Sequence, residues 1–135
     1  MKKTALALVL VIILVLISCS LFACTKYNSS YSALMCVKSQ GSKDGFIKFD
    51  EFKGRYVFNF KYDGEGEGQI KYTASIGNGT VTVYYDSNDE KKELFKIENG
   101  QSVSETAGTI VNGHVYIIIE SNGKVESGSF EFELV

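Results

Sequence analysis

The sequence predicts an all-β fold: an antiparallel two-sheet β-sandwich, jelly-roll-like, with about eight strands. Two observations carry this prediction. From residue 31 onward apolar residues recur with a period of two, which is the period of a strand with one buried face. Turn residues separate these runs every 8 to 12 positions, which is about the spacing typical of sandwiches. The chain has 135 residues, which is enough for one domain of ordinary size.

Each strand is predicted from its own alternation. In 55–62, for example, Tyr56, Phe58, Phe60 and Tyr62 form one apolar row. Further clear runs are 70–76, 81–85, 114–120 and 129–134, and weaker ones are 33–38, 46–50 and 93–97.

The turns between the runs contain glycine beside asparagine or aspartate. Asn-Gly tolerates positive φ at both central positions of a two-residue hairpin. Because Asn112-Gly113 and Asn122-Gly123 bracket the most apolar run, we expect that run to lie centrally between two hairpin partners. The remaining signals are Asp63-Gly64, Gly77-Asn78-Gly79 and Asn99-Gly100.

The last third of the chain carries a family resemblance. Gly113–Glu120 followed by Gly128–Leu134 resembles the closing hairpin of bacterial pre-peptidase C-terminal domains. The resemblance implies a secreted jelly-roll-like sandwich, of a class often tied to adhesion or substrate targeting.

The N-terminus has the pattern of an export signal. Lys2 and Lys3 precede an apolar run, and small residues lead up to Cys24, where a polar stretch begins. Leu21-Phe22-Ala23-Cys24 resembles the bacterial lipobox. This resemblance implies a lipoprotein signal peptide at 1–23 and thioether-linked diacylglycerol on Cys24.

Three alternatives remain open for this segment. Leu16-Ile17-Ser18-Cys19 matches the letters of the lipobox better, but cleavage there would leave an apolar stub on the mature protein. The segment is also long enough to remain as a transmembrane anchor, or it could be removed as an ordinary secretory signal. We predict lipidation at Cys24, a flexible tether over 24–30 and the sandwich domain over 31–135. The expected location is the extracytoplasmic side of a bacterial cell membrane, with membrane lipid as a partner.

Charge and residue inventory exclude several function classes. Loss of Lys2 and Lys3 with the leader lowers the bases from 14 to 12 against 16 acids, a net charge of −4. Nucleic-acid binding needs clustered bases, so we expect none. His114 is the only histidine, and Cys36 is the only cysteine clearly inside the folded part. Zinc sites, catalytic triads and a disulfide framework are therefore not expected. His114 is predicted to be exposed and structural.

Two acidic segments partly resemble calcium sites. Asp63–Gly68 has three carboxylates at alternate positions, yet it also fits a soluble acidic hairpin tip. Asp86–Glu90 begins like a calcium loop, but Lys91 stands where that motif needs glycine. We predict no metal and no cofactor.

Tyrosine offers the remaining candidate surface, since the chain has eight tyrosines and no tryptophan. Tyr84 and Tyr116 both fall on the row opposite the main apolar row, where they form either a stacking surface or part of a packed edge. We predict a non-enzymatic binding or adhesion module for a protein or glycan. The alternative is a structural accessory subunit of a cell-envelope complex, and a hydrolase ranks third.

Overall fold

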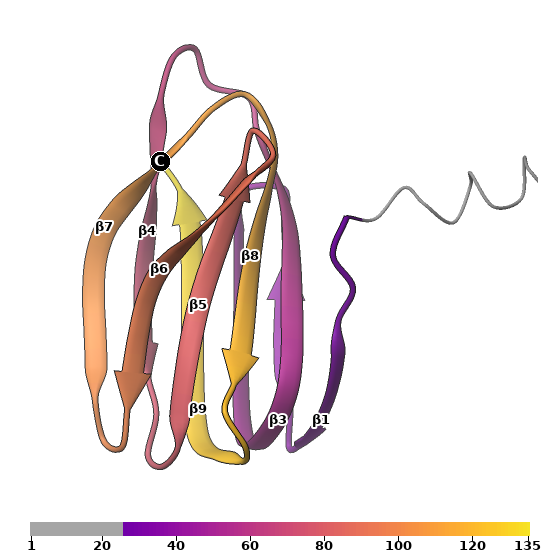
Figure 1. Cartoon of the computed structure of the whole chain (residues 1–135), viewed down its shortest axis with the longest axis vertical. Coiled ribbons are helices and arrows are strands. Elements are labelled where there is room, and N and C mark those ends of the chain that lie inside the picture. The colour runs from indigo at the N-terminus through magenta and orange to yellow at the C-terminus, as the bar shows by residue number, and fades with distance from the viewer. Residues whose placement is uncertain (1–25) are drawn as a thin grey trace, which may run out of the picture.

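A computed structural model describes residues 26–135, and these residues form nine antiparallel strands and no helix (Figure 1). Over this range no helix is long and apolar enough to cross a membrane. The strands are β1 (Ser30–Leu34), β2 (Val37–Gln40), β3 (Asp44–Tyr62), β4 (Gly68–Ser75), β5 (Thr80–Ser87), β6 (Glu90–Glu98), β7 (Ser102–Ile110), β8 (Gly113–Ser121) and β9 (Val125–Leu134).

The strands form two packed layers that share β3. Hydrogen-bonded neighbours follow the order β6-β5-β8-β3-β9-β4-β7, with β1 and β2 also paired to β3. The half of β3 at 55–62 pairs with β8, and the half at 44–52 pairs with β9. Figure 1 shows β5 and β8 in one layer, with β4 and β9 in the layer behind. β3 therefore connects the layers through one continuous strand.

The bend in β3 needs a glycine. Gly54 has φ +120°, a value that L side chains rarely adopt. A Cβ at this position would also collide with the backbone of Ser30, which pairs with the next residue of β3. The strand can turn from one layer into the other because this residue has no side chain.

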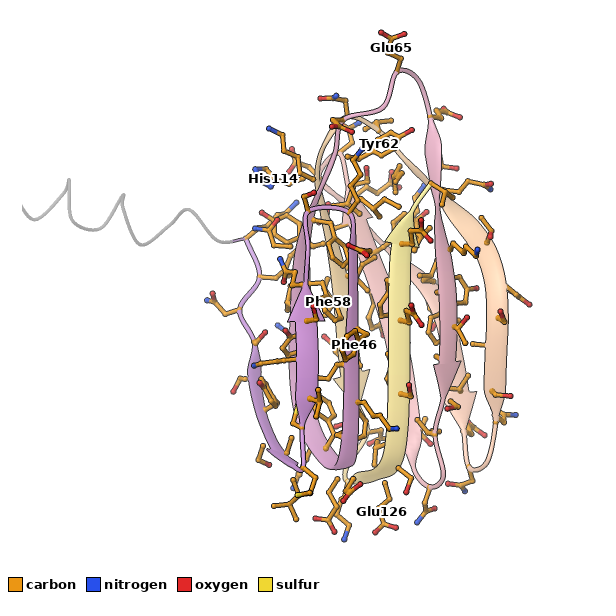
Figure 2. All side chains as sticks on the ribbon, turned by 180° about the vertical axis from the view of Figure 1, so that it is seen from behind. Phe46, Phe58, Tyr62, Glu65, His114 and Glu126 are labelled. Carbon is orange, nitrogen blue, oxygen red and sulfur yellow. The ribbon has the colours of Figure 1, made fainter. Side chains whose placement is uncertain are left out.

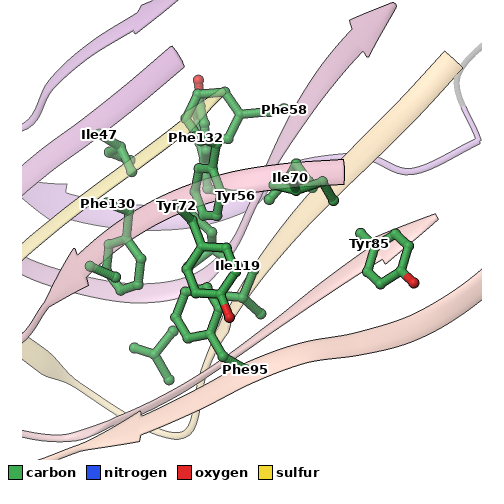
Figure 3. Packing of buried hydrophobic residues seen from close by; sticks show 14 of the residues in the cluster. Ile47, Tyr56, Phe58, Ile70, Tyr72, Tyr85, Phe95, Ile119, Phe130 and Phe132 are labelled. Atoms are coloured by element: carbon green, nitrogen blue, oxygen red, sulfur yellow. The ribbon is translucent and has the colours of Figure 1, made fainter. Parts of the chain in front are cut away.

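The core lies between the layers and is rich in aromatic rings (Figure 3). Tyr72 stacks on Phe95 with ring centroids 4.5 Å apart and an interplanar angle of 12°. Phe58 of β3 stacks on Phe60 of the same strand and packs against Phe132 from β9, and all three are fully buried. Such rings bury large apolar areas, so this core can stabilise a domain of this size without a disulfide.

The predicted all-β antiparallel sandwich is confirmed, with nine strands in the described range. The runs at 46–50 and 55–62 are the two halves of the single strand β3. The run at 33–38 divides into β1 and β2 at Met35, which has φ +53° and is 78% exposed.

The sequence pattern did not indicate β7. Its outward positions are polar, its apolar residues do not form a regular row, and Gly108 interrupts it with φ +76°. β7 ends the path of paired strands, so only one neighbour, β4, constrains its pattern.

Cys19 and Cys24, the two candidates for lipidation, belong to residues 1–25 and lie outside the described residues. Residues 26–29, expected as part of a flexible tether, lie against the domain, and β1 begins at Ser30. Cys36 is a half-buried free thiol that packs against the core.

Candidate functional site

The outward row of β8 is buried although it faces away from the core. The inward row is Val115, Ile117 and Ile119. In the outward row, Tyr116 is 8% exposed and Ile118 is 0% exposed. A half-buried strand would leave this row in water, so something covers the outer face of β8.

The residues beside this row come from β5 and β3. Asp86 of β5 lies opposite Tyr116, and Tyr84 lies opposite Ile118. On the other side, Val57 of β3 lies opposite Ile118. Tyr84 and Tyr116 therefore share one face of one sheet, which is the arrangement that a stacking surface requires.

The covering segment is the N-terminal strap, defined here as residues 26–29. The Tyr27 hydroxyl donates a hydrogen bond to Asp86 Oδ2 at 2.5 Å. Its ring meets the Tyr116 ring edge-on, with centroids 5.3 Å apart. Lys26 Nζ lies 2.9 Å from Asp86 Oδ2 and 3.0 Å from Asp89 Oδ1. The strap is thus held by one aromatic contact and a group of charge-assisted bonds.

The Asp86 carboxylate is the buried charge of this site, with its side chain 3% exposed. Burial alone raises the pKa of a carboxyl group. The hydrogen bonds from Tyr27 and Lys26 outweigh that effect, and the pKa of Asp86 lies below its ordinary value. Burial and the bond to Asp86 raise the pKa of Tyr27. Asp86 is therefore an ionised acceptor and Tyr27 a neutral donor.

A hollow of about 440 Å³ opens beside the strap at the turn end of β8. His114 is exposed at its rim, and its ring lies 6.2 Å from that of Tyr116 at an interplanar angle of 26°. His114 Nδ1 lies 3.1 Å from the side-chain oxygen of Asn59. Figure 2 shows His114 on the same side of the domain as β1. The lining residues are Lys26, Asp86, Asn88, Asp89, Asn112, His114 and Tyr116.

A second hollow of about 330 Å³ lies on the other side of the strap. There Glu120 Oε1 lies 2.9 Å from Arg55 Nη2 and 3.6 Å from Lys91 Nζ. Lys91 also lies over the Tyr84 ring, 4.4 Å from its centroid. The lining residues are Asn28, Ser30, Gly54, Arg55, Glu120 and Ser121.

Of the two acidic segments, only Asp86–Glu90 contributes residues to this site. Asp63 pairs with Lys43 at 2.6 Å, which lowers the pKa of Asp63, and Glu65 lies at the tip of the β3–β4 loop (Figure 2). Within 26–135 no group of three or more His, Cys, Asp or Glu side chains is arranged to hold a metal ion. Asn88 and Asp89 form the tight β5–β6 turn, with φ values of 62° and 61°.

Sequence reasoning placed Tyr84 and Tyr116 on one candidate surface and took His114 as an exposed structural residue. It did not identify Asp86 or the strap as part of the site. The sequence contained one signal for a covered outer face. The inward row of β8 is apolar, and Tyr116 and Ile118 in its outward row are apolar as well. Two apolar rows on one strand indicate two buried faces. Nothing comparable marked Lys26 and Tyr27.

The buried carboxyl group of the site, Asp86, has a lowered pKa, whereas the general acid of a glycosidase requires a raised one. Ring faces next to carboxylate, amide and ammonium groups can instead contact apolar faces and hydroxyl groups of one bound molecule.

No family model and no curated protein matches the chain. Among solved structures, the chain is similar to a family 61 carbohydrate-binding module in complex with β-1,4-galactotriose. The TM-score is 0.50 at 12% sequence identity, and the match covers 79% of this chain and 87% of the other. A family 29 carbohydrate-binding module variant complexed with cellulohexaose matches with a TM-score of 0.42 and 16% identity, over 80% and 78% of the two chains. The first likeness shows the β-sandwich fold.

Proposed function

We propose that this protein is a non-catalytic glycan-binding module. The observation that carries the proposal is the hollow in which the rings of His114 and Tyr116 lie beside the ionised carboxylate of Asp86. A similar fold, the family 61 module, is described in complex with β-1,4-galactotriose, and this supports the choice of ligand class.

The chemistry of the hollow matches a saccharide. A sugar ring has an apolar C–H face, which packs on an aromatic ring, and hydroxyl groups at its edge, which donate to carboxylates and amides. Asp86 and Asp89 supply acceptors, and Asn88 and Asn112 supply both donors and acceptors. The two carboxylates favour a neutral glycan over an acidic one, because like charges repel at close range.

The test is a binding screen of the full chain in detergent against an array of neutral oligosaccharides that includes β-1,4-galactotriose. His114→Ala removes the exposed ring at the rim and should weaken binding about fivefold, the loss expected for one aromatic contact of about 1 kcal/mol. Phe46→Ala is the matched control, since it removes a partly exposed ring from the other layer (Figure 2). It should leave binding unchanged.

Two results would contradict the proposal. One is the absence of binding to every oligosaccharide in the array. The other is a loss of binding with Phe46→Ala that His114→Ala does not cause, which would move the site to the other layer.

The proposal includes a lipid anchor at Cys24 on the extracytoplasmic side of a bacterial membrane. Two acyl chains hold a protein stably at a bilayer where one does not, since each buried methylene contributes about 0.8 kcal/mol. Intact-mass analysis of membrane-extracted protein tests this, with Cys24→Ser and Cys19→Ser as a matched pair. We expect Cys24→Ser alone to abolish acylation. Unmodified wild-type protein would overturn the anchor.

The second candidate, an accessory subunit of an envelope complex, is favoured by the exposed turn between β1 and β2. Leu34, Met35 and Val37 are large apolar residues that face solvent there. A Leu34→Ser, Met35→Ser double variant should lose a crosslinked protein partner in intact membranes if this function holds. His114→Ala is the control that should retain the partner.

A further inference from the structure

We propose that the N-terminal strap regulates the glycan site by occupying part of it, so that a bound glycan and the docked strap exclude each other. This inference rests on the proposed function. It concerns residues 26–29, which come from the segment that joins the domain to the export signal.

Tyr27 takes the contacts that a sugar ring would make in the same place. Its hydroxyl donates to Asp86, the buried acceptor of the site, and its ring covers Tyr116. Tyr116 is only 8% exposed with the strap in place, so it cannot serve as an open stacking surface in this state. The strap therefore covers the Tyr116 ring and also provides hydrogen-bond donors for the Asp86 carboxylate.

The strap also divides what would otherwise be a longer groove. Lys26 lines the first hollow, whereas Asn28 lines the second. Beneath the strap runs the outward row of β8, from His114 at the first hollow to Glu120 at the second. Six residues of strand span about 20 Å. With the strap lifted, the face could accept an oligosaccharide that extends along β8.

The contacts of the strap are of a kind that a ligand can replace. Besides the bonds to Asp86, the strap accepts a hydrogen bond at Ser29 Oγ from the backbone N–H of Val57, at 2.9 Å. The ladder of backbone pairs with β3 begins only at Ser30. Sugar hydroxyls can offer equivalent donors to Asp86, so displacement leaves no buried charge unsatisfied.

The next tyrosine along the chain shows what a permanent contact looks like. Tyr31 lies within β1, packs on the core, and stacks on Phe52 with centroids 5.5 Å apart. Its hydroxyl accepts from Lys38, away from both hollows. Tyr31 and Tyr27 are four residues apart, yet only Tyr27 touches the site.

The experiment measures oligosaccharide binding by the full chain in detergent, with the same array and with β-1,4-galactotriose in every case. Tyr27→Ala should tighten binding about tenfold, which corresponds to a strap that is docked about nine-tenths of the time. Tyr27→Phe, which keeps the ring and loses the donor, should give a smaller gain. Tyr31→Phe removes a hydroxyl from the same segment and should change nothing.

Hydrogen–deuterium exchange gives a second readout on the wild-type chain. A saturating oligosaccharide should speed exchange at residues 26–29 and slow it at β8. Urea unfolding of each variant identifies any that lose stability for reasons unrelated to binding.

The outcomes separate the strap from the function. Equal affinities in wild type and both Tyr27 variants, or slower exchange in the strap on binding, would overturn the inference and leave the glycan site intact. Binding by none of the variants would overturn the proposed function, and the inference with it. Binding by Tyr27→Ala where wild type shows none supports both.

Discussion

β8 and β9 are both interior strands with a full inward apolar row, yet their outward rows differ completely. β9 alternates, with Glu131 and Glu133 exposed between buried apolar residues. β8 is buried at five successive positions, including Tyr116 and Ile118 on its outer face. The same local fold thus leaves one outer face to water and turns the other into an interface, and the outward residue types decide which.

Two tyrosine–carboxylate pairs show the same contrast on a smaller scale. Tyr72 of β4 donates to Glu105 of β7 at 3.2 Å, and these residues are also direct partners in the sheet. Tyr27 donates to Asp86 from outside the sheet, 59 positions away in the chain. The first pair is fixed by neighbouring strands. The second depends on whether the strap is docked.

The largest expected effect tests the two outward rows directly. Ile118→Ala deletes a fully buried side chain and should lower the free energy of unfolding by about 3 kcal/mol. Glu131→Ala, at an exposed outward position of β9, should change it by less than about 0.5 kcal/mol. Urea denaturation of both variants measures this. Similar values for the two would mean that the outer face of β8 is not an interface.

The next effect separates the strap's carboxylate from its exposed neighbour. Asp86→Asn removes the charge that Tyr27 and Lys26 bind and should cost about 1.5 kcal/mol of unfolding free energy, the range for hydrogen bonds to charged groups. Asp89→Asn changes a side chain that is 94% exposed and should have no measurable effect. A larger loss in Asp89→Asn would contradict the assignment of Asp86 as the main anchor.

Acid should release the strap through the same carboxylate. The pKa of Asp86 is lowered in the folded chain, so its contribution is present above the ordinary value of 3.8 and is lost as the pH falls through the lowered pKa. Lys26 and Tyr27 contact this carboxylate, and both keep their protons in this range because their pKa values are raised. Because the intrinsic rate of amide exchange itself changes with pH, the readout is the protection factor, the ratio of the unprotected to the observed rate. We expect protection factors at residues 26–29 to fall below that pH in wild type, and Asp86→Asn to lack this step.

The smallest effect at neutral pH belongs to the fixed pair. Tyr72→Phe removes one hydrogen bond and should cost about 1 kcal/mol. Burial and the bond to Glu105 raise the pKa of Tyr72 to about 12. Its contribution is therefore complete below pH 10 and is lost as the pH rises toward 12. Unfolding monitored across this alkaline range should show a drop in wild type that Tyr72→Phe lacks.

Much of the fold could be predicted, because apolar residues at alternate positions show which face of a strand is buried. The rows of β3, β4, β5, β8 and β9 follow that pattern, and each became a strand of the sandwich. β7 was not predicted, because an edge strand with polar outward residues and a glycine has no such row. The single strand β3 appeared as two runs because its buried row changes phase between Phe49 and Phe52.

The site was less accessible to sequence reasoning. Tyr116 and Tyr84 could be placed on one face from parity alone, since side chains alternate along each strand. The sequence pattern placed Asp86 only at the start of a calcium-like loop, although it is the last but one residue of β5 and buried. The docking of Tyr27 is a contact between segments that are distant in the sequence. The polar residues around Tyr27 have no periodicity from which this contact could be predicted.

The position of the strap has a mechanical consequence. Tyr27 and Lys26 bind Asp86. Both residues precede Ser30, which forms the first backbone pair with β3, at Arg55. Tension that arrives through the N-terminal segment therefore loads the Tyr27–Asp86 contact before it loads the β1–β3 ladder. The side-chain contact can yield while the sandwich keeps every strand, so a pull from that end uncovers the outer face of β8 without unfolding the domain.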